Sequence, residues 1–308
     1  MSASAIEWTD AVWNPVTGCD RVSPGCAHCY ALELAPRLRA MHAARGGGKW
    51  ADAPDGTRAS SGPAFGVKLH PNVLEQPLRW RRPRRVFVNS MSDLFHEDVP
   101  YQFIAEVFDV MRRCPDHTFQ VLTKRPERMQ RWLSWESPFR FDEPLPNVWL
   151  GVSIENRRFV YRADVLRDTP AAVRFISAEP LLGQLTDAAC ICCLKPVGHY
   201  DLCLDCANNL CVDCGIDEET GEPWGSNPEP YDRYPDHRLS LHRIDWLIVG
   251  GESGPRHRPI RPEWVRDLRD AARAAGTPFF FKQWGGRTPK AGGRELDGRT
   301  WDEMPEDR

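Results

Sequence analysis

The chain has 308 residues, of which 41% are apolar and 27% are charged, and its formal net charge is −3 at pH 7. This composition is typical of a globular protein, and the charge gives no overall attraction to nucleic acid or to an anionic membrane. No apolar run approaches the ~20 residues needed to cross a bilayer. The first residues are acidic and lack an apolar signal segment. We therefore expect a cytoplasmic protein with no membrane partner and with reduced thiols.

Strands and helices are predicted to alternate along most of the chain. The segment IEWTDAVWNPVTGC reads as a short strand, and residues 31–44 have a helical composition that Pro36 interrupts. Residues 45–66 are rich in glycine, alanine, serine and proline and predict a loop. Further helices are expected over 71–82, 100–114, 124–133, 159–168 and 263–275, and further strands over 84–89, 118–123, 147–153, 173–177, 244–249 and 278–281.

This alternation predicts an α/β fold with a parallel sheet, either a (β/α) barrel or a partial TIM-like barrel. The strands end in small or charged segments, namely NSMSDLFH, TKRPE, SIEN, SAEP, GGESG and KQWGG. In parallel α/β folds the carboxyl ends of the strands carry the active site, so these segments predict one functional rim. No G-x-G-x-x-G follows a strand, which argues against a dinucleotide-binding sheet.

Three cysteines, Cys19, Cys26 and Cys29, lie in a short loop after the first strand. An odd number of closely spaced thiols favours a metal centre over disulfides, and structural zinc usually takes four protein ligands. An iron–sulfur cluster with only three cysteine ligands leaves one iron open to an exogenous ligand. We therefore predict a [4Fe–4S] cluster. A zinc site completed by His28 or a distant residue, and three incidental thiols, are the alternatives.

A cysteine-rich insert is expected over 186–243, between the two parts of a barrel core at 1–185 and 244–308. The insert holds three C-x2-C pairs, which are Cys190/Cys193, Cys203/Cys206 and Cys211/Cys214. Repeated pairs with this spacing are typical of zinc-ribbon-like sites. We expect structural zinc in the insert, with a second iron–sulfur cluster as the alternative, and the spacing leaves open which four cysteines share the metal.

The whole chain resembles a phage and bacterial three-cysteine-motif family of unassigned function. The motifs that carry the resemblance run in order from Glu7 to Gly285 and are EWTDAVWNPVTGC, FVNSMSDLFHEDVP, LTKRPER, GVSIEN, SAEPLLG, DWLIVGGESG and PFFFKQWG. The cysteine loop ahead of parallel β/α units also resembles the radical S-adenosylmethionine (radical SAM) enzymes. Their common spacing is C-x3-C-x2-C, whereas the spacing here is C-x6-C-x2-C. The resemblance implies an open cluster that cleaves S-adenosylmethionine to start radical chemistry on a substrate.

A bound S-adenosylmethionine needs partners for its carboxylate, amine and ribose, and the strand ends supply suitable groups. Lys124 is the candidate partner of the carboxylate. The other cofactor-binding candidates are Asn89, Ser90, Ser92, Asp93, Ser153, Glu155, Glu179, Gly250, Gly251 and Glu252. The superfamily's Gly-Gly-Glu segment follows its second strand, whereas the one here follows a late strand, so that role is not carried over by name. Simpler roles stay open for some of these residues, such as a helix cap for Asp93 and close packing for the two glycines.

A second function class is a nucleic-acid-associated protein in which both metal sites are structural. The basic run RWRRPRR at 79–85 and the zinc-ribbon-like insert favour this class, while the net charge does not. The residue patterns identify no catalytic residue, and they leave the substrate and any protein partner open.

Overall fold

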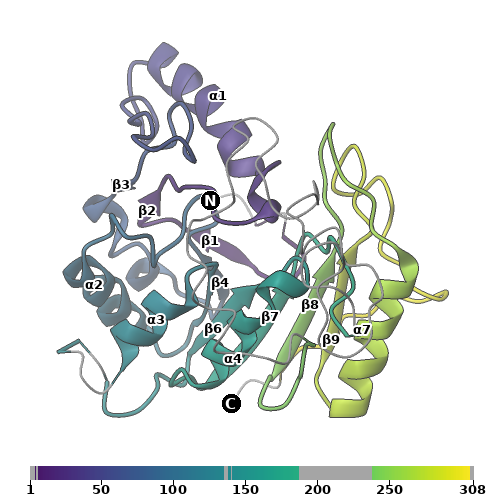
Figure 1. The fold of residues 1–308 in the computed structure, drawn as a ribbon. Helices are drawn as coiled ribbons and strands as arrows, with labels where there is room; N and C mark the ends of the chain where they lie inside the picture. The colour runs from purple at the N-terminus through teal and green to yellow at the C-terminus, as the bar shows by residue number, and fades with distance from the viewer. Residues whose placement is uncertain (1–3, 5, 135–137, 140, 187–237, 306–308) are drawn as a thin grey trace, which may run out of the picture.

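A computed structural model describes residues 4, 6–134, 138–139, 141–186 and 238–305. Its main feature is a sheet of seven parallel strands in the order β1-β4-β5-β6-β7-β8-β9, which curls into a half-barrel (Figure 1). The strands are β1 (Ala11–Trp13), β4 (Arg85–Val88), β5 (Thr118–Thr123), β6 (Val148–Ser153), β7 (Val173–Ala178), β8 (Trp246–Gly250) and β9 (Phe279–Gln283). A separate antiparallel pair joins β2 (Val16–Thr17) to β3 (Lys68–Leu69).

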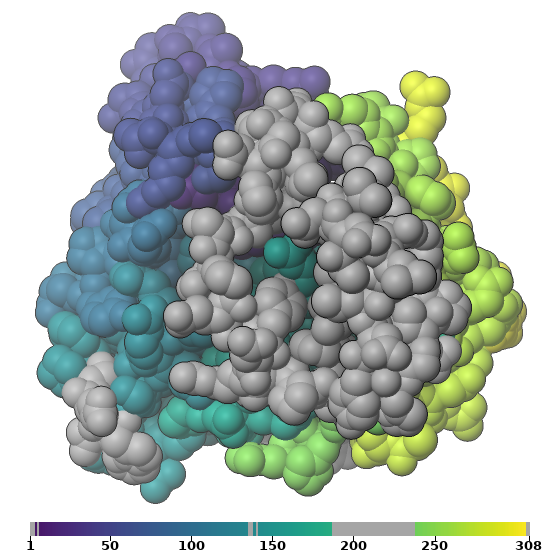
Figure 2. Space-filling view, in the orientation of Figure 1, coloured from purple at the N-terminus to yellow at the C-terminus, as the bar shows by residue number. Residues whose placement is uncertain are grey.

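Helices cover the outer, convex face of the sheet. The helices are α1 (Tyr30–Ala44), α2 (Tyr101–Arg112), α3 (Pro126–Leu133), α4 (Tyr161–Arg167) and α7 (Pro262–Ala275), with short 3-10 helices η1 (Pro24–Cys26), η2 (Pro71–Val73), η3 (Pro77–Arg79) and η4 (Arg157–Phe159). Helix α1 projects away from the sheet, on the opposite flank of the molecule from α7 (Figures 1 and 2). Every helix in the described part of the chain is too short or too polar to span a membrane.

Side chains alternate between the two faces of each strand, as the period of two requires. The outward residues, such as Val121, Leu150 and Leu247, join the large core beneath the helices. That core also contains Phe103, Ile104, Val107 and Phe108, which lie on one apolar stripe of α2. Both faces of β6 and β8 are buried, which explains why these strands read as continuous apolar runs.

Aromatic residues fill the inside of the half-barrel near the amino ends of its strands. Trp246 is fully buried there, and its ring lies 5.9 Å from Trp149, 6.0 Å from Phe280 and 6.1 Å from Trp8 in edge-to-face contacts. Its indole Nε1 donates to the carbonyl of Glu303 at 2.8 Å. Aromatic rings therefore pack the inner face at one end. Gln120 of β5 is a polar residue buried beside them, where its Nε2 donates to the carbonyl of Trp8 at 3.3 Å, and the charged groups of the rim lie at the carboxyl ends of the strands.

The predicted partial barrel is confirmed as a half-barrel of seven parallel strands. Within the described residues, β1 and β9 are the edges of this sheet and do not pair with each other, so the closed form of the prediction is not seen. The cysteine-rich insert lies almost entirely outside the described residues, and so do all six of its predicted metal ligands, which are Cys190, Cys193, Cys203, Cys206, Cys211 and Cys214.

One predicted helix is wrong. Residues 71–82 form the two short helices η2 and η3 instead of one α-helix. Pro77 lacks an N–H, and its ring clashes with the preceding turn, which disfavours a continuous α-helix through this position. Pro36 carries the same penalty, yet α1 continues through it as one helix, so the sequence expectation of an interruption there is also wrong.

We predict that Trp246→Ala lowers the free energy of unfolding by about 3–5 kcal/mol, because it leaves a cavity in the aromatic plug. Denaturant unfolding followed by circular dichroism measures the change. The matched control is Trp264→Ala on α7, whose side chain is only partly buried and whose loss should cost much less. Equal losses in both variants would contradict the role assigned to the plug.

Candidate active site at the carboxyl ends of the strands

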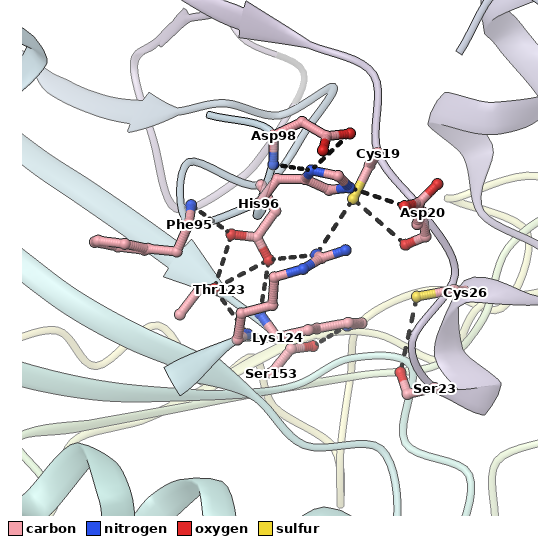
Figure 3. Close-up of polar contacts among 12 residues, drawn as sticks. Cys19, Asp20, Ser23, Cys26, Phe95, His96, Asp98, Thr123, Lys124 and Ser153 are labelled. Atoms are coloured by element: carbon pink, nitrogen blue, oxygen red, sulfur yellow. Dashed lines mark hydrogen bonds and ion pairs between the residues drawn. The ribbon is translucent and has the colours of Figure 1, made fainter. Parts of the chain in front are cut away.

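The three N-terminal cysteines lie on one loop between β2 and α1. Cys19 follows β2, Cys26 ends η1, and Cys29 directly precedes α1. The amide of Cys29 donates to the carbonyl of Cys26 at 3.2 Å, so the last two cysteines share one tight turn. All three side chains are partly exposed thiols without a disulfide. Figure 3 shows Cys19 and Cys26 on this loop, beside Lys124 and Ser153 at the ends of β5 and β6.

The surroundings of two of these thiols favour the protonated form. Burial raises the pKa of Cys19 to about 12, although the nearby Arg125 guanidinium acts to lower it. Burial and the charge of Cys26 raise the pKa of Cys29. A bound metal ion, which replaces the protons, would supply the positive charge that favours the ionised form of these thiols.

Glu155 anchors the cysteine loop to the sheet. It lies just beyond β6, is fully buried, and accepts a hydrogen bond from the Ser23 hydroxyl at 2.5 Å. Its carboxylate also pairs with Lys124 Nζ at 2.9 Å and Arg162 Nη1 at 3.2 Å. Burial alone raises the pKa of a carboxyl group, but the two cations outweigh burial and lower the pKa of Glu155. A Cβ at Gly25 would lie 2.5 Å from Glu155 Oε1, so only glycine allows this approach.

A second anchor joins the loop to the end of β8. Glu252 Oε2 accepts from Arg258 Nε at 2.9 Å and lies 3.1 Å from His28 Nδ1. Arg258 Nη2 also donates to the carbonyl of Pro24 at 2.9 Å. Burial acts to raise the pKa of Glu252, but hydrogen bonds from Arg258 and His28 outweigh burial. The pKa of Glu252 therefore lies below its usual value. The carboxylate thus engages Nδ1 of His28 and not Nε2, as it does in many metal-ligating histidines, so the alternative in which His28 completes a zinc site stays a prediction.

Arg125 connects Cys19 to Asp93. Its Nη1 lies 3.5 Å from Cys19 Sγ and 3.2 Å from Asp93 Oδ2, and its side chain is mostly buried. Asp93 also accepts from the Thr123 hydroxyl at 2.8 Å and from the amide of Phe95 at 3.0 Å. Asp93 therefore orders the turn after β4 and positions Arg125. It does not cap α2, which begins eight residues later at Tyr101.

A third anchor lies on the outer side of Cys19. Asp20 Oδ2 lies 3.0 Å from Nε2 of the fully buried His96 and accepts from Arg58 Nη1 at 2.6 Å. The amide of Asp98 donates to His96 Nδ1 at 3.1 Å, which leaves Nε2 as the nitrogen that carries the proton toward Asp20. Arg58 belongs to the 45–66 loop, so this anchor also ties that loop to the cysteine loop.

Several predicted cofactor-binding residues form one connected network below the cysteine loop. Lys124 Nζ donates to the hydroxyl of Ser153 as well as to Glu155, and that hydroxyl donates to the carbonyl of Glu179 at 3.2 Å. Glu179 Oε1 pairs with Lys282 Nζ at 3.0 Å. The network therefore runs across the ends of β5, β6, β7 and β9, as expected for a shared rim.

The other candidates lie on the β1 side of the half-barrel or serve close packing. Asn89 Oδ1 accepts from the amide of Val16 at 3.1 Å, and the Ser92 hydroxyl donates to the carbonyl of Val16 at 2.9 Å. The Ser90 hydroxyl donates to Asn14 Oδ1 at 3.2 Å. Gly250 and Gly251 face the side chain of Glu179 and the backbone of Trp284 too closely to admit a Cβ, so packing explains both glycines.

The site residues that were not predicted from the sequence include Ser23, Arg125, Arg162 and Arg258, and also Asp20, Arg58 and His96 of the third anchor. Arg162 lies on α4, seven residues after Glu155, and its contact depends on how α4 returns to the end of β6. Arg125 and His96 had a sequence signal, because they belong to the strand-end segments TKRPE and NSMSDLFH. Within the part of the chain that the structure describes, no three His, Cys, Asp or Glu side chains are placed to hold a single metal ion.

The family model described as "Protein of unknown function (DUF5131)" matches residues 3–305. The chain belongs to the DUF5131 family. This match confirms that the resemblance covers the whole chain and that the family's function is unassigned. The family's description mentions neither a three-cysteine motif nor radical SAM enzymes, so those two parts of the resemblance remain predictions. No curated protein and no solved structure matches the chain.

The DUF5131 chain also has a cavity of about 740 Å³ at the opposite end of the sheet. Its lining includes Val173, the first residue of β7, together with Asp245 and Pro278, which directly precede β8 and β9. It is therefore separated by the length of the strands from the cysteine loop. The chemistry-bearing groups gather at the carboxyl ends, so we place the candidate site there.

We predict that Glu155→Gln lowers the free energy of unfolding by about 3–5 kcal/mol, because it leaves two buried cations without their shared carboxylate. Denaturant unfolding at neutral pH measures this loss. Glu106→Gln, at an exposed position of α2, is the matched control and should leave stability within about 0.5 kcal/mol of the parent. A Glu155→Gln variant as stable as this control would contradict the anchor.

Proposed function

We propose that the protein is an iron–sulfur enzyme of the radical SAM type, in which Cys19, Cys26 and Cys29 hold a [4Fe–4S] cluster. One observation carries this proposal: three free thiols lie on a single loop that Glu155 and Glu252 fasten over the polar carboxyl ends of a parallel half-barrel. Parallel α/β folds place their active sites at this end.

The residues present supply the donors that a cluster needs. Three free thiols lie on one loop, and cluster cysteines each bind a different iron, so they need not converge on one point. Arg125 beside Cys19 and the cationic Lys124 supply the positive charge that thiolate ligands require.

Cys19, Cys26 and Cys29 would hold the cluster, and the chemistry it would supply is one-electron, reductive cleavage of S-adenosylmethionine with an electron from an external reductant. The protein's own residues orient the reactants and exclude water. Lys124 uses two of its three donors on Ser153 and Glu155, which leaves one for a carboxylate. The Glu179–Lys282 pair presents both charges on the other side of the rim.

The direct test uses protein purified and reconstituted without oxygen. The reduced protein is examined by electron paramagnetic resonance before and after S-adenosylmethionine is added, and 5′-deoxyadenosine is assayed. A spectrum that changes on addition, with the nucleoside formed, is the expected result. A cluster signal indifferent to S-adenosylmethionine would overturn the radical chemistry and leave a structural or electron-transfer centre.

We predict that Cys26→Ala abolishes iron binding at the N-terminal loop, because two thiolates do not retain the cluster. Iron and zinc are measured by elemental analysis of the reconstituted protein. Zinc should remain if the insert binds it as the sequence predicts. Cys114→Ala, which removes a buried cysteine of the core, is the control and should keep its iron. Full iron occupancy in Cys26→Ala would rule out the cluster assignment.

We predict that Arg125→Met shifts the reduction potential of the protein's cluster to a more negative value. Reduction adds negative charge, and the guanidinium 3.5 Å from Cys19 Sγ stabilises that charge. A redox titration monitored by electron paramagnetic resonance measures the potential. Arg128→Met is the matched control, because Arg128 contacts the ring of Tyr101 and the carbonyl of Val99 instead of a cysteine. An equal shift in both variants would contradict a specific effect of Arg125.

A second candidate function, binding of nucleic acid, is favoured by the basic run at 79–85. Arg79, which ends η3, and Arg81 and Arg82, which lie between η3 and β4, are exposed. This surface lies at the amino end of β4, away from the cysteine loop, so it would serve attachment and not the chemistry. Binding of RNA and DNA over a salt series tests it, and the absence of salt-sensitive binding would remove it.

A further inference from the structure

Residues 56–62 form a small polar flap on the loop that follows α1. The amide of Gly56 donates to the carbonyl of Gly62 at 2.9 Å, which closes the flap on itself. No residue of the flap is buried. The chain on either side of it is anchored by buried apolar residues, Ala53 before the flap and Phe65 after it, which pack in one cluster. The flap is therefore an exposed projection on a fixed base.

The backbone around Cys19 is bonded to the flap and to its base. The amide of Arg21 donates to the carbonyl of Ser60 at 2.9 Å, and the amide of Cys19 donates to the carbonyl of Phe65 at 3.1 Å. The Ser61 hydroxyl lies 3.2 Å from the carbonyl oxygen of Cys19. The first of the three candidate ligands is thus held by a segment that comes after α1 in the sequence.

Arg58 is the charged contact of the flap. Its Nη1 donates to Asp20 Oδ2 at 2.6 Å, and its two Nη atoms donate to the two carboxylate oxygens of Asp98 at 2.8 Å each. A bidentate pair fixes a guanidinium in one orientation. Asp20 directly follows Cys19, and Asp98 lies on the other side of the His96 ring (Figure 3). Arg58 therefore joins the flap both to the cysteine loop and to the turn after β4.

Cys26 and Cys29 are held by other contacts than Cys19. These two cysteines share one tight turn, and Glu155 and Glu252 fasten that part of the loop to the ends of β6 and β8. Cys19 lies outside both of these anchors, because six residues separate it from Cys26. The wide first gap of the C-x6-C-x2-C motif therefore gives Cys19 a separate set of contacts, and those of the flap belong to it.

We propose that the flap is a clamp that positions Cys19 separately from Cys26 and Cys29, with Arg58 as its positioning residue. Opening of the flap breaks polar contacts at the surface and exposes no buried residue of the flap, so it is a local event of low cost compared with unfolding. When the flap opens, the segment of Cys19 loses these contacts, while the turn of the other two cysteines keeps its own anchors.

One part of this inference rests on the proposed function, namely that the clamped thiol is a metal ligand. The clamp itself consists of contacts within the chain, so it is tested without a metal.

Hydrogen–deuterium exchange of the full chain, before any iron is added, measures the opening. In Arg58→Gln, a peptide that covers Arg21, whose amide is bonded to the flap, should exchange about three- to tenfold faster, because the guanidinium contacts are lost. The peptide that carries Cys26 and Cys29 should exchange at the parent rate. Thr57→Ala is the matched control, because this exposed side chain of the flap makes no hydrogen bond among the described residues.

A second variant, Asp98→Asn, weakens the clamp from its other side and leaves Arg58 in the chain. It should accelerate exchange at Arg21 by a smaller factor. Arg58→Lys keeps the charge and should fall between the parent and Arg58→Gln. Circular dichroism checks that each variant is folded. Unchanged exchange at Arg21 in both Arg58→Gln and Asp98→Asn, or an equal rise at Cys26 and Cys29, would overturn the clamp.

Alkylation of the thiols by N-ethylmaleimide provides an independent readout. Trypsin releases Cys19 on the peptide 1–21 and the other two cysteines on the peptide 22–37, so mass spectrometry follows them separately. Arg58→Gln should raise the modification of Cys19 relative to the other two, and Thr57→Ala should leave that ratio at its parent value. An unchanged ratio in Arg58→Gln would mean that the flap does not position this thiol.

The variants are then reconstituted with iron and sulfide, so that two failures are distinguishable. Arg58→Gln should lose iron to a chelator faster than the parent, and its electron paramagnetic resonance spectrum should differ because the surroundings of Cys19 change. A clamp shown by exchange, in protein that takes up no iron, would keep this inference and remove the proposed function. A cluster that responds to S-adenosylmethionine, with the parent spectrum and the parent rate of iron loss in Arg58→Gln, would keep the proposed function and remove the clamp.

Discussion

A fully buried carboxylate, Glu155, holds the site together. Burying a charge is costly unless cations and hydrogen bonds surround it, and here Lys124, Arg162 and Ser23 supply them. These three partners come from the end of β5, from α4 and from the cysteine loop. One carboxylate therefore joins the sheet, a covering helix and the loop of candidate ligands. The close approach of Gly25 shows how tightly the loop is seated on it.

The half-barrel divides its interior into two regions with different physical roles. Aromatic rings around Trp246 fill the inside at the end where the strands begin, so that end contributes stability. Serines, lysines and glutamates occupy the end at which the strands finish, where they pair with one another under the cysteine loop. The groups of the candidate site therefore gather at one end, and the large outer core beneath the helices supports that end.

Charge at the polar end is balanced. Glu155, Glu179 and Glu252 each have a cationic partner, which makes most of the rim self-compensating. In the cysteine loop burial favours the neutral, protonated form of Cys19 and Cys29. Groups with perturbed pKa values are common at functional sites. A metal centre at the thiols would replace their protons and supply the positive charge that the thiolates need.

The sequence by itself determined the α/β class, nearly all the strands, and the rim of polar strand ends. It could do so because buried parallel strands are continuous apolar runs in the sequence, and here each run is followed by a polar segment. It also placed the three cysteines on one loop. It failed at 71–82, where Pro77 overrides a helical composition. Only the tertiary structure decided that the barrel is a half-barrel, that Glu155 and Glu252 anchor the loop, and that Arg125, Arg162 and Arg258 belong to the site. Those contacts join residues that are distant in the sequence or on different elements. The chain contains many arginines, and the sequence around each one does not indicate which carboxylate it will contact.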